Sequence, residues 1–342
     1  MAGELSRPKD AILPIAAGLG GMIVPALLYL AFNSTGEAHA GWGVPMATDI
    51  AFALGILYLL GDKIPISLKV FLTALAIADD IGAVLVIAFF YTSDINMASL
   101  LYGGGFFGIL LVGNLLGVRN IVFYGIVGIG GLWMAFLLSG VHATIAGIIA
   151  ALTIPANVKI EDAHFITKMK ALVSNFEQST PNQVSFLTHD QLEIIEKIRF
   201  YSLAALTPLQ RLEYAMHPLV AFIVMPVFAL ANAGITFSGN FVENMVSHVS
   251  LGVIVGLVVG KFIGIVGVSK ILVKLKLASL PEGIKWRHVY GVALLAGVGF
   301  TMSLFITDLA FDDPTYIIQS KIGFSQLQSW VELVGFLILR KA

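Results

Sequence analysis

Long apolar runs alternate with short polar ones along the whole chain, and this pattern predicts ten membrane-spanning segments. An apolar run of about 18 residues or more is long enough to cross a bilayer as a helix. We place the spans near 11–32, 43–60, 68–91, 97–117, 121–138, 141–155, 217–234, 250–270, 288–308 and 321–339. The expected fold is an all-α polytopic membrane protein, with residues 1–342 in a single transmembrane domain.

The composition agrees with this class of protein. Hydrophobic residues make up 58% of the chain and charged residues 12%, and the mean hydropathy is +0.91. These values exclude a soluble domain with a single anchor. A net charge of -1 argues against a nucleic-acid partner, and the absence of cysteine excludes disulfides and thiolate metal sites.

The distribution of Lys and Arg predicts the orientation. With residues 1–10 in the cytoplasm, all but two of the 20 basic residues fall in inner loops or at the inner ends of spans. The exceptions are Lys321, at the outer end of a helix, and Lys261, inside a span. The positive-inside rule therefore places both termini in the cytoplasm.

Two spans are interrupted by helix-breaking residues. Segment 41–55 carries Gly and Pro just ahead of Thr48 and Asp49, and segment 291–308 carries two glycines at mid-membrane. They are the second members of two triplets, 11–91 and 250–339, which the charge rule orients oppositely. Interrupted helices at matching positions of inverted repeats indicate the binding site of a transporter. Facing half-helix ends need neutralising charges, which Asp49 and Lys261 could supply.

Two adjacent carboxylates, Asp79 and Asp80, lie at the middle of the span 68–91. An acidic side chain at that depth costs roughly 2.5–3.5 kcal/mol on insertion scales. Such residues mark ion or proton pathways in membrane proteins. The pair is therefore the candidate site of an ion or proton pathway.

Lys261 lies too deep in its span to reach water by simple extension, and snorkelling towards the interface is the alternative to an ion pair. Adjacent helix positions point about 100° apart. One member of the Asp79–Asp80 pair can therefore meet Lys261 while the other faces the cation.

A cytoplasmic insertion of residues 156–216 separates the sixth and seventh spans. Its first part is expected to be a loop, and its second part an amphipathic helix. Thr207 and Pro208 then form an N-cap and first helical position. Glu213 and His217 follow, one turn apart, and are either a pH-responsive pair or ordinary helix-end residues.

Eight sequence segments resemble the NhaA family of bacterial Na⁺/H⁺ antiporters: ATDIAFALG, LTALAIADDIGAVLVIAFFYT, SGVHATIAGI, RLEYAMHPLVAF, FALANAG, VVGKFIGI, LPEG and GFTMSLFI. The resemblance covers nearly the whole chain in order. It implies an inverted-repeat antiporter fold of twelve helices, two of them discontinuous and crossing.

The resemblance also implies roles for individual residues. Asp79 and Asp80 would bind the cation and protons, and Lys261 would be the partner of Asp79. Thr48 and Asp49 would lie at the helix crossing. The pair Glu213 and His217 would belong to a cytoplasmic pH-sensing cluster.

The beginning of the chain resembles the loop before the third helix of the family. The expectation is that two N-terminal helices, which carry the dimerising hairpin, are absent, so that a homodimer would be weakened. A truncated, inactive antiporter is one alternative reading.

The function expected is electrogenic, pH-regulated Na⁺(Li⁺)/H⁺ antiport in the bacterial inner membrane, without a cofactor and without enzymatic activity. Its partners would be the lipid bilayer and the ions Na⁺, Li⁺ and H⁺. A sodium-coupled solute symporter on the same inverted-repeat plan is an alternative. An intramembrane aspartyl protease using Asp49 and one of the pair is another, but the Gly-Asp dipeptide of such proteases occurs only in a loop, at Gly61–Asp62.

Overall fold

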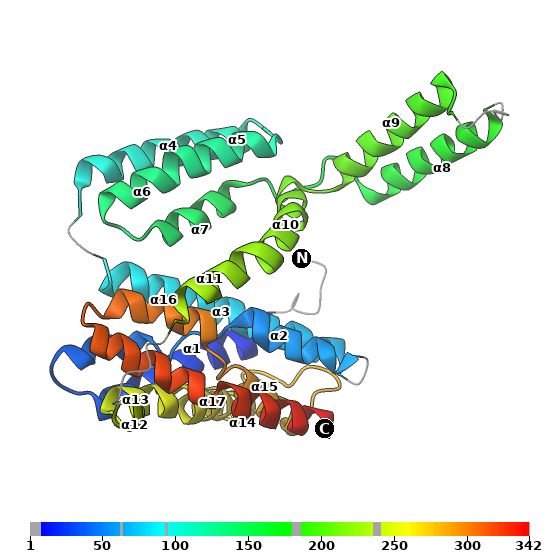
Figure 1. Cartoon of the computed structure of the whole chain (residues 1–342). Helices are drawn as coiled ribbons and strands as arrows, with labels where there is room; N and C mark the ends of the chain where they lie inside the picture. Colours follow the sequence, from blue (N-terminus) through cyan, green and yellow to red (C-terminus); the bar gives the residue numbers. More distant parts are fainter. Residues whose placement is uncertain (1–7, 62–63, 93–94, 180–185, 235–240, 342) are drawn as a thin grey trace. The chain divides into compact units, whose positions relative to one another are not determined.

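The computed structural model describes residues 8–61, 64–92, 95–179, 186–234 and 241–341, and these residues form helices and turns without a strand (Figure 1). Seven helical stretches are long and apolar enough to cross a membrane. They are Ala11–Phe32, Ile66–Phe90, Met97–Leu115, Ile121–Ser139, Pro208–Asn232, His248–Lys274 and Pro314–Arg340. An eighth span is a pair of helices bent by 46°, Trp286–Leu295 and Phe300–Ala310. The all-α polytopic fold is confirmed.

Two of the ten predicted spans are shorter in the structure than the sequence suggested. The span predicted at 141–155 is α7 (Ala143–Thr153), an 11-residue helix. At 1.5 Å per residue it is about 16 Å long, against about 30 Å of hydrocarbon. The span predicted at 43–60 contains a turn and a short non-helical stretch, followed by the 10-residue helix α2 (Ile50–Leu59). By length, seven or eight spans are present among the described residues, not ten.

The chain divides into two compact units, and each is described by itself. The first contains residues 1–91 and 225–342, and the second contains residues 92–224. The first unit therefore holds both triplets that the sequence predicted to be inverted repeats.

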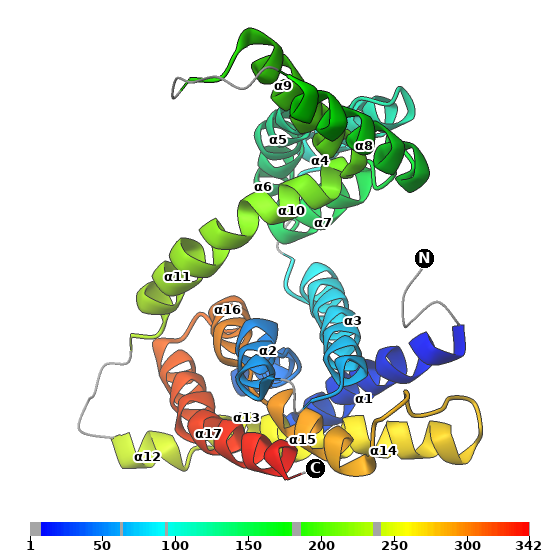
Figure 2. The ribbon, with the colours of Figure 1, turned by 90° about the vertical axis from the view of Figure 1, so that its right-hand side faces the viewer.

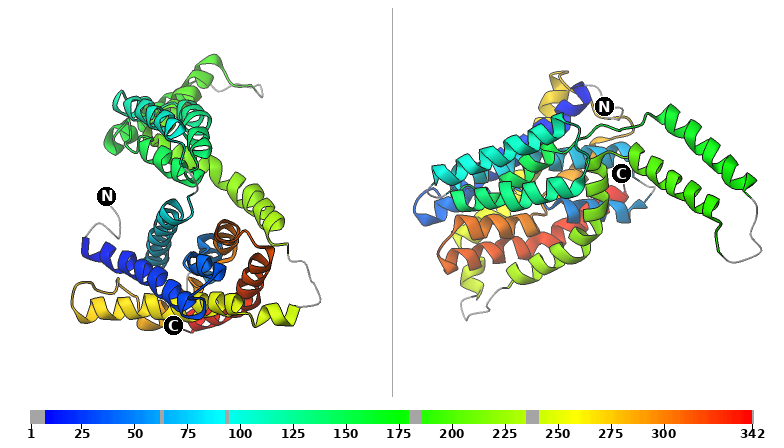
Figure 3. Two further views of the ribbon diagram at one scale, coloured as in Figure 1. Left: turned by 90° about the vertical axis from the view of Figure 1, so that its left-hand side faces the viewer. Right: turned by 90° about the horizontal axis from the view of Figure 1, so that it is seen from above.

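The first unit is built from a 3₁₀ turn and helices from both ends of the chain. They are α1 (Pro8–Phe32), η1 (Glu37–Gly43), α2, α3 (Ile66–Phe90), α11 (Met225–Asn232), α12 (Phe241–Met245), α13 (His248–Val255), the π-helical η5 (Gly256–Gly260), α14 (Lys261–Lys274), α15 (Trp286–Leu295), α16 (Phe300–Ala310) and α17 (Pro314–Arg340). Figures 2 and 3 show α2 and α16 enclosed between α3 and α17. Helices distant in sequence thus surround the two interrupted segments.

Small residues allow α1 to lie against the stretch from η5 to α14. A Cβ atom on Gly264 would overlap the backbone of Gly20, and one on Gly260 would lie 2.7 Å from Cα of Pro25. Close backbone approach through small residues is typical of helix packing in membranes, where the hydrophobic effect contributes little. This contact holds Lys261, the residue after η5, at a fixed depth beside α1 and α3.

The second unit contains α4 (Met97–Leu115), α5 (Ile121–Gly125), η3 (Ile126–Trp133), α6 (Met134–Ser139), α7, α8 (Asp162–Gln178), α9 (His189–Ala205), α10 (Pro208–Leu219) and η4 (Val220–Val224). The prediction of a loop in the first part of 156–216 is wrong, because α8 is a helix that packs against α9. Thr207 caps α10 as predicted, in a capping box with Gln210 and with Pro208 in the first turn.

Candidate functional site

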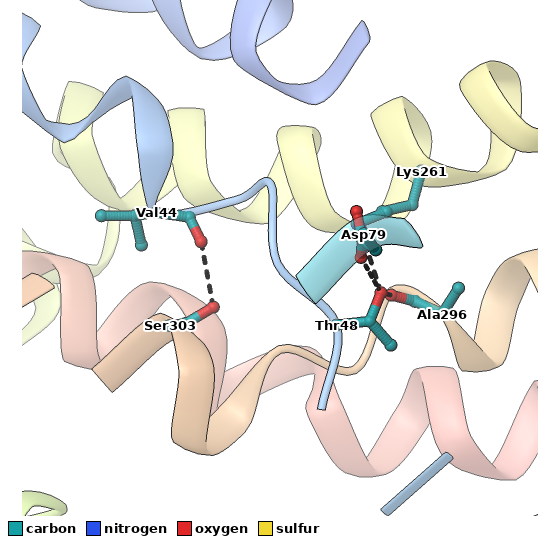
Figure 4. Close-up of polar contacts among 6 residues, drawn as sticks. All are labelled: Val44, Thr48, Asp79, Lys261, Ala296 and Ser303. Carbon is teal, nitrogen blue, oxygen red and sulfur yellow. Dashed lines mark hydrogen bonds and ion pairs between the residues drawn. The ribbon is translucent and has the colours of Figure 1, made fainter. Parts of the chain in front are cut away.

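The two interrupted segments cross in the first unit. A turn at residues 44–46 and a short non-helical stretch lead to Asp49, the N-cap of α2. α15 and α16 are separated by the break at 296–299. The amide of Asp49 donates to the carbonyl of Val298 at 2.7 Å, and Ser303 Oγ donates to the carbonyl of Val44 at 3.1 Å (Figure 4). In Figure 1, α2 and α16 extend from this crossing in opposite directions. The non-helical backbone is thus satisfied by protein at membrane depth, as it must be there.

Asp49 joins the N-termini of both half-helices. Its Oδ1 accepts from the amides of Ala51 and Phe52 at the start of α2, each at 3.2 Å. Its Oδ2 accepts from the amide of Thr301 at 3.0 Å and from Thr301 Oγ1 at 2.5 Å, in the first turn of α16. Helix N-termini carry a partial positive charge and unpaired amides. One buried carboxylate therefore caps two helices, and both of its oxygens are occupied.

A second buried cluster lies beside the crossing and joins four parts of the chain: the segment before α2, α3, the start of α14 and the break after α15 (Figure 4). Lys261 Nζ lies 2.5 Å from Asp79 Oδ2, and both side chains are fully buried. Lys261 also donates to Thr48 Oγ1 at 3.0 Å, and Thr48 Oγ1 lies 2.6 Å from Asp79 Oδ2 and 2.8 Å from the carbonyl of Ala296. A hydroxyl has one proton, so Thr48 donates to only one of these two oxygens at a time.

Asp80, the neighbour of Asp79 on α3, is only partly buried and has a different environment. Its Oδ1 is shielded from solvent and has no hydrogen-bond partner among the described residues, and the same is true of Asp79 Oδ1. Buried carboxylate oxygens are almost always paired, since an unpaired one is unfavourable by about 1–3 kcal/mol or more. Two such oxygens on adjacent residues therefore offer hard ligands to a cation or acceptors to protons.

The structure brings together Thr48, Asp49, Asp79 and Lys261 around the crossing, with Asp80 next to Asp79. Glu213 and His217 lie on α10 in the second unit, and both are exposed. No ion pair joins them among the described residues. Their pH-sensing role stays a prediction.

Sequence reasoning missed the backbone groups of the site. The carbonyls of Ala296 and Val298 bind Thr48 and Asp49, and a carbonyl has no signature in a side-chain pattern. The glycines at 297 and 299 were the available signal, because they allow the helix to open there. No group of three or more His, Cys, Asp or Glu side chains with the geometry of a metal site is found within the described ranges.

Comparison with known proteins identifies the class of transporter. A family model described as Na⁺/H⁺ antiporter 1 matches residues 1–339. The protein named Na⁺/H⁺ antiporter NhaA of Oleidesulfovibrio alaskensis is 48% identical over 99% of this chain and 76% of its own length. That of Acidithiobacillus ferrooxidans is also 48% identical, over 99% and 78%. NhaA 1 of Psychromonas ingrahamii is 45% identical, over 99% and 77%. Matched by the model over almost its whole length, the chain belongs to the Na⁺/H⁺ antiporter 1 family.

Proposed function

We propose that the protein exchanges Na⁺ or Li⁺ for protons at the Asp79–Asp80 pair. The observation that carries the proposal is that two shielded carboxylate oxygens beside the crossing, Asp79 Oδ1 and Asp80 Oδ1, find no partner within the described part of the chain. A dehydrated alkali ion needs such hard, anionic oxygens, and Thr48 Oγ1 is the neighbouring neutral one.

Competition between the two ligands would provide the coupling. The carboxylates bind a cation only when they are ionised, and protonation removes the charge that balances it. Two carboxylates carry up to two protons against the single charge of Na⁺, so the exchange would move net charge and be electrogenic. The two groups form one coupled site, and apparent titrations belong to the pair.

Lys261 would hold the site together while it is not occupied by a cation. Its ammonium neutralises Asp79 in a place where an isolated charge is highly unfavourable. A cation that approaches Asp79 would compete with this ammonium, so binding would weaken the ion pair. Asp49 would keep its structural place throughout, because four donors at two helix N-termini hold its oxygens.

The same occupancy of Asp49 argues against an aspartyl protease. A protease dyad requires two carboxylates that share a proton and are free to activate water. Both oxygens of Asp49 are instead bound to helix amides and to Thr301. With Asp49 bound in this way, a dyad made with Asp79 or Asp80 would lack one of its two free carboxylates.

The distribution of Lys and Arg supports an inner-membrane orientation with both termini in the cytoplasm. Exported Na⁺ would then leave on the side of the loop between α1 and η1. Regulation by pH would involve Glu213 and His217 at the start of the span Pro208–Asn232. The homodimer suggested by the resemblance belongs to the same proposal.

Dissipation of a pH gradient in everted membrane vesicles from antiporter-deficient cells tests the function. Na⁺ or Li⁺ should collapse the gradient, and K⁺ serves as the test of selectivity. No added solute should be needed, and a requirement for an organic solute would favour the symporter. A valinomycin-imposed potential should change the rate if the exchange is electrogenic. Vesicles that contain the protein and keep their gradient with Na⁺ and Li⁺ at every pH would contradict the proposal.

A further inference from the structure

The segment that leads into the crossing is attached at several points to the ends of two helices. η1 (Glu37–Gly43) is a 3₁₀ turn, and Thr48 follows its last residue by five positions. Tyr29 Oη, on α1, donates to the carbonyl of Ala38 at 2.8 Å. Tyr91, directly after α3, provides a second attachment at the other end of η1.

The hydroxyl of Tyr91 makes two hydrogen bonds to η1. It donates to the carbonyl of Ala40 at 2.6 Å and accepts from the amide of Gly43 at 3.3 Å. A phenol has one proton and accepting lone pairs, so both bonds can exist together, and it stays protonated at neutral pH. A single hydroxyl therefore attaches η1 both as a hydrogen-bond donor and as an acceptor.

Aromatic packing places this hydroxyl. The ring of Trp42 stacks on Tyr91, with centroids 6.3 Å apart, and meets the edge of Phe90 at 5.1 Å. A Cβ atom at Gly43 would lie 2.8 Å from Tyr91 Oη, so glycine is needed for the close approach. The ring is held by packing, and the hydroxyl alone makes the polar contacts.

Asp79 lies on α3 and Tyr91 is the C-cap of the same helix, 12 positions further along or about 18 Å at 1.5 Å per residue. Asp79 binds Thr48, and Tyr91 binds the start of the segment that carries Thr48. α3 thus holds both ends of the stretch between Ala40 and Thr48. Movement of η1 away from Tyr91 would therefore also shift Thr48 relative to Asp79.

From this geometry we infer that Tyr91 is a positioning residue, whose hydroxyl latches η1 to the end of α3 and so holds the segment from Val44 to Thr48 against Asp79. The inference deepens the proposed function, because the held segment supplies Thr48 to the ion site. Loss of the hydroxyl frees η1 and raises the accessibility of the segment behind it. It also weakens apparent cation binding by loosening Thr48.

The absence of native cysteine makes a direct test possible. Val44, which follows η1 and is fully buried, is replaced by Cys as a reporter, with and without Tyr91→Phe. The rate of modification by a membrane-impermeant maleimide is measured in intact cells and in everted vesicles. Ser34→Cys, at an exposed position between α1 and η1, shows from which side the reagent reaches this end of the protein.

Tyr91→Phe should raise the modification rate of Val44→Cys about tenfold, from the same side that labels Ser34→Cys. Tenfold corresponds to about 1.4 kcal/mol, the scale of one or two neutral hydrogen bonds. The matched control is Tyr102→Phe, which removes the same hydroxyl from a residue that is 71% exposed on α4, and it should leave the rate unchanged. If Val44→Cys is modified at the same rate with Tyr91 and with Tyr91→Phe, the inference is overturned.

A second reporter distinguishes local release from general unfolding. Val289 is fully buried on α15 in a different hydrophobic cluster, and Val289→Cys should stay unmodified with Tyr91→Phe. Faster labelling at both positions would make Tyr91 a general stability residue and overturn the latch. In transport, Tyr91→Phe should raise the Na⁺ concentration for half-maximal exchange and change the maximal rate little. If the parent protein shows no Na⁺-dependent proton flux, the proposed function fails while the labelling still decides the latch.

Discussion

Removal of Lys261 is the perturbation whose magnitude follows most directly from the structure. Its ammonium lies 2.5 Å from Asp79 Oδ2, and both side chains are fully excluded from solvent. Lys261→Ala leaves a buried carboxylate whose remaining partner is the hydroxyl of Thr48. Breaking a buried ion pair in this way destabilises proteins by about 3–5 kcal/mol. An unfolding entropy of about 2.1 cal/mol/K per residue over the 342 residues gives roughly 1.4 °C per kcal/mol, so the melting temperature should fall by about 4–7 °C.

A double-mutant cycle isolates the ion pair from the packing of the lysine stem. Lys261→Ala, Asp79→Ala and the double variant are compared by heating detergent-solubilised protein and measuring the folded fraction by size-exclusion chromatography. The double variant should be less destabilised than the two single effects added together, because it contains no uncompensated charge.

A partly exposed ion pair elsewhere in the first unit is the matched control. Lys321 and Asp308 lie 3.4 Å apart, with 12% and 37% of their side chains exposed. Pairs in contact with solvent contribute about 0–1 kcal/mol, so Lys321→Ala should melt within about 2 °C of the parent. The reasoning is refuted if Lys261→Ala melts with the parent, or if the effects in the cycle are additive.

Three further outcomes are expected. Asp49→Ala removes the cap of two helices and should destabilise the protein by about 1–4 kcal/mol. This is roughly twice the effect expected for Asp313→Ala, because Asp313 caps only α17. Equal losses of stability in thermal melts would contradict the double cap. Gly264→Ala should destabilise the protein by about 1–3 kcal/mol, because the added Cβ meets the backbone of α1. Gly267→Ala, three residues further along α14, places its Cβ in open space and should not destabilise. Similar melting temperatures for the two variants would refute this packing. His217→Ala should move the pH profile of exchange and keep its maximal rate, and an unmoved profile would leave His217 without a sensing role.

Charge in an apolar context made most of the site predictable. Asp79, Asp80 and Lys261 stand out because ionisable residues are rare at the centre of a span. Gly and Pro made the interrupted helices predictable for a similar reason, since they break a helix wherever they occur at membrane depth. The charge pattern alone left open which aspartate meets Lys261.

The remaining features depend on tertiary contacts. Asp49 caps α16 from 252 residues away in sequence, and no local pattern encodes that distance. η5 is a π-helical stretch that sets the position of Lys261 through its hydrogen bonding, without a distinctive composition. α8 buries little of its surface, with Leu172 as its one buried residue, and it packs against α9. This pairing of two helices is a tertiary contact that the loop prediction did not take into account.

The central claim is that a cation and protons compete for the Asp79–Asp80 pair, and proton release on cation addition tests it most directly. Purified protein in weakly buffered detergent at mildly alkaline pH is mixed with NaCl, with choline chloride as the control for ionic strength. The parent should acidify the solution with NaCl alone, and folded Asp80→Asn should release no protons, because an amide does not ionise. Equal acidification by the parent and Asp80→Asn, or none by the folded parent, would contradict the account.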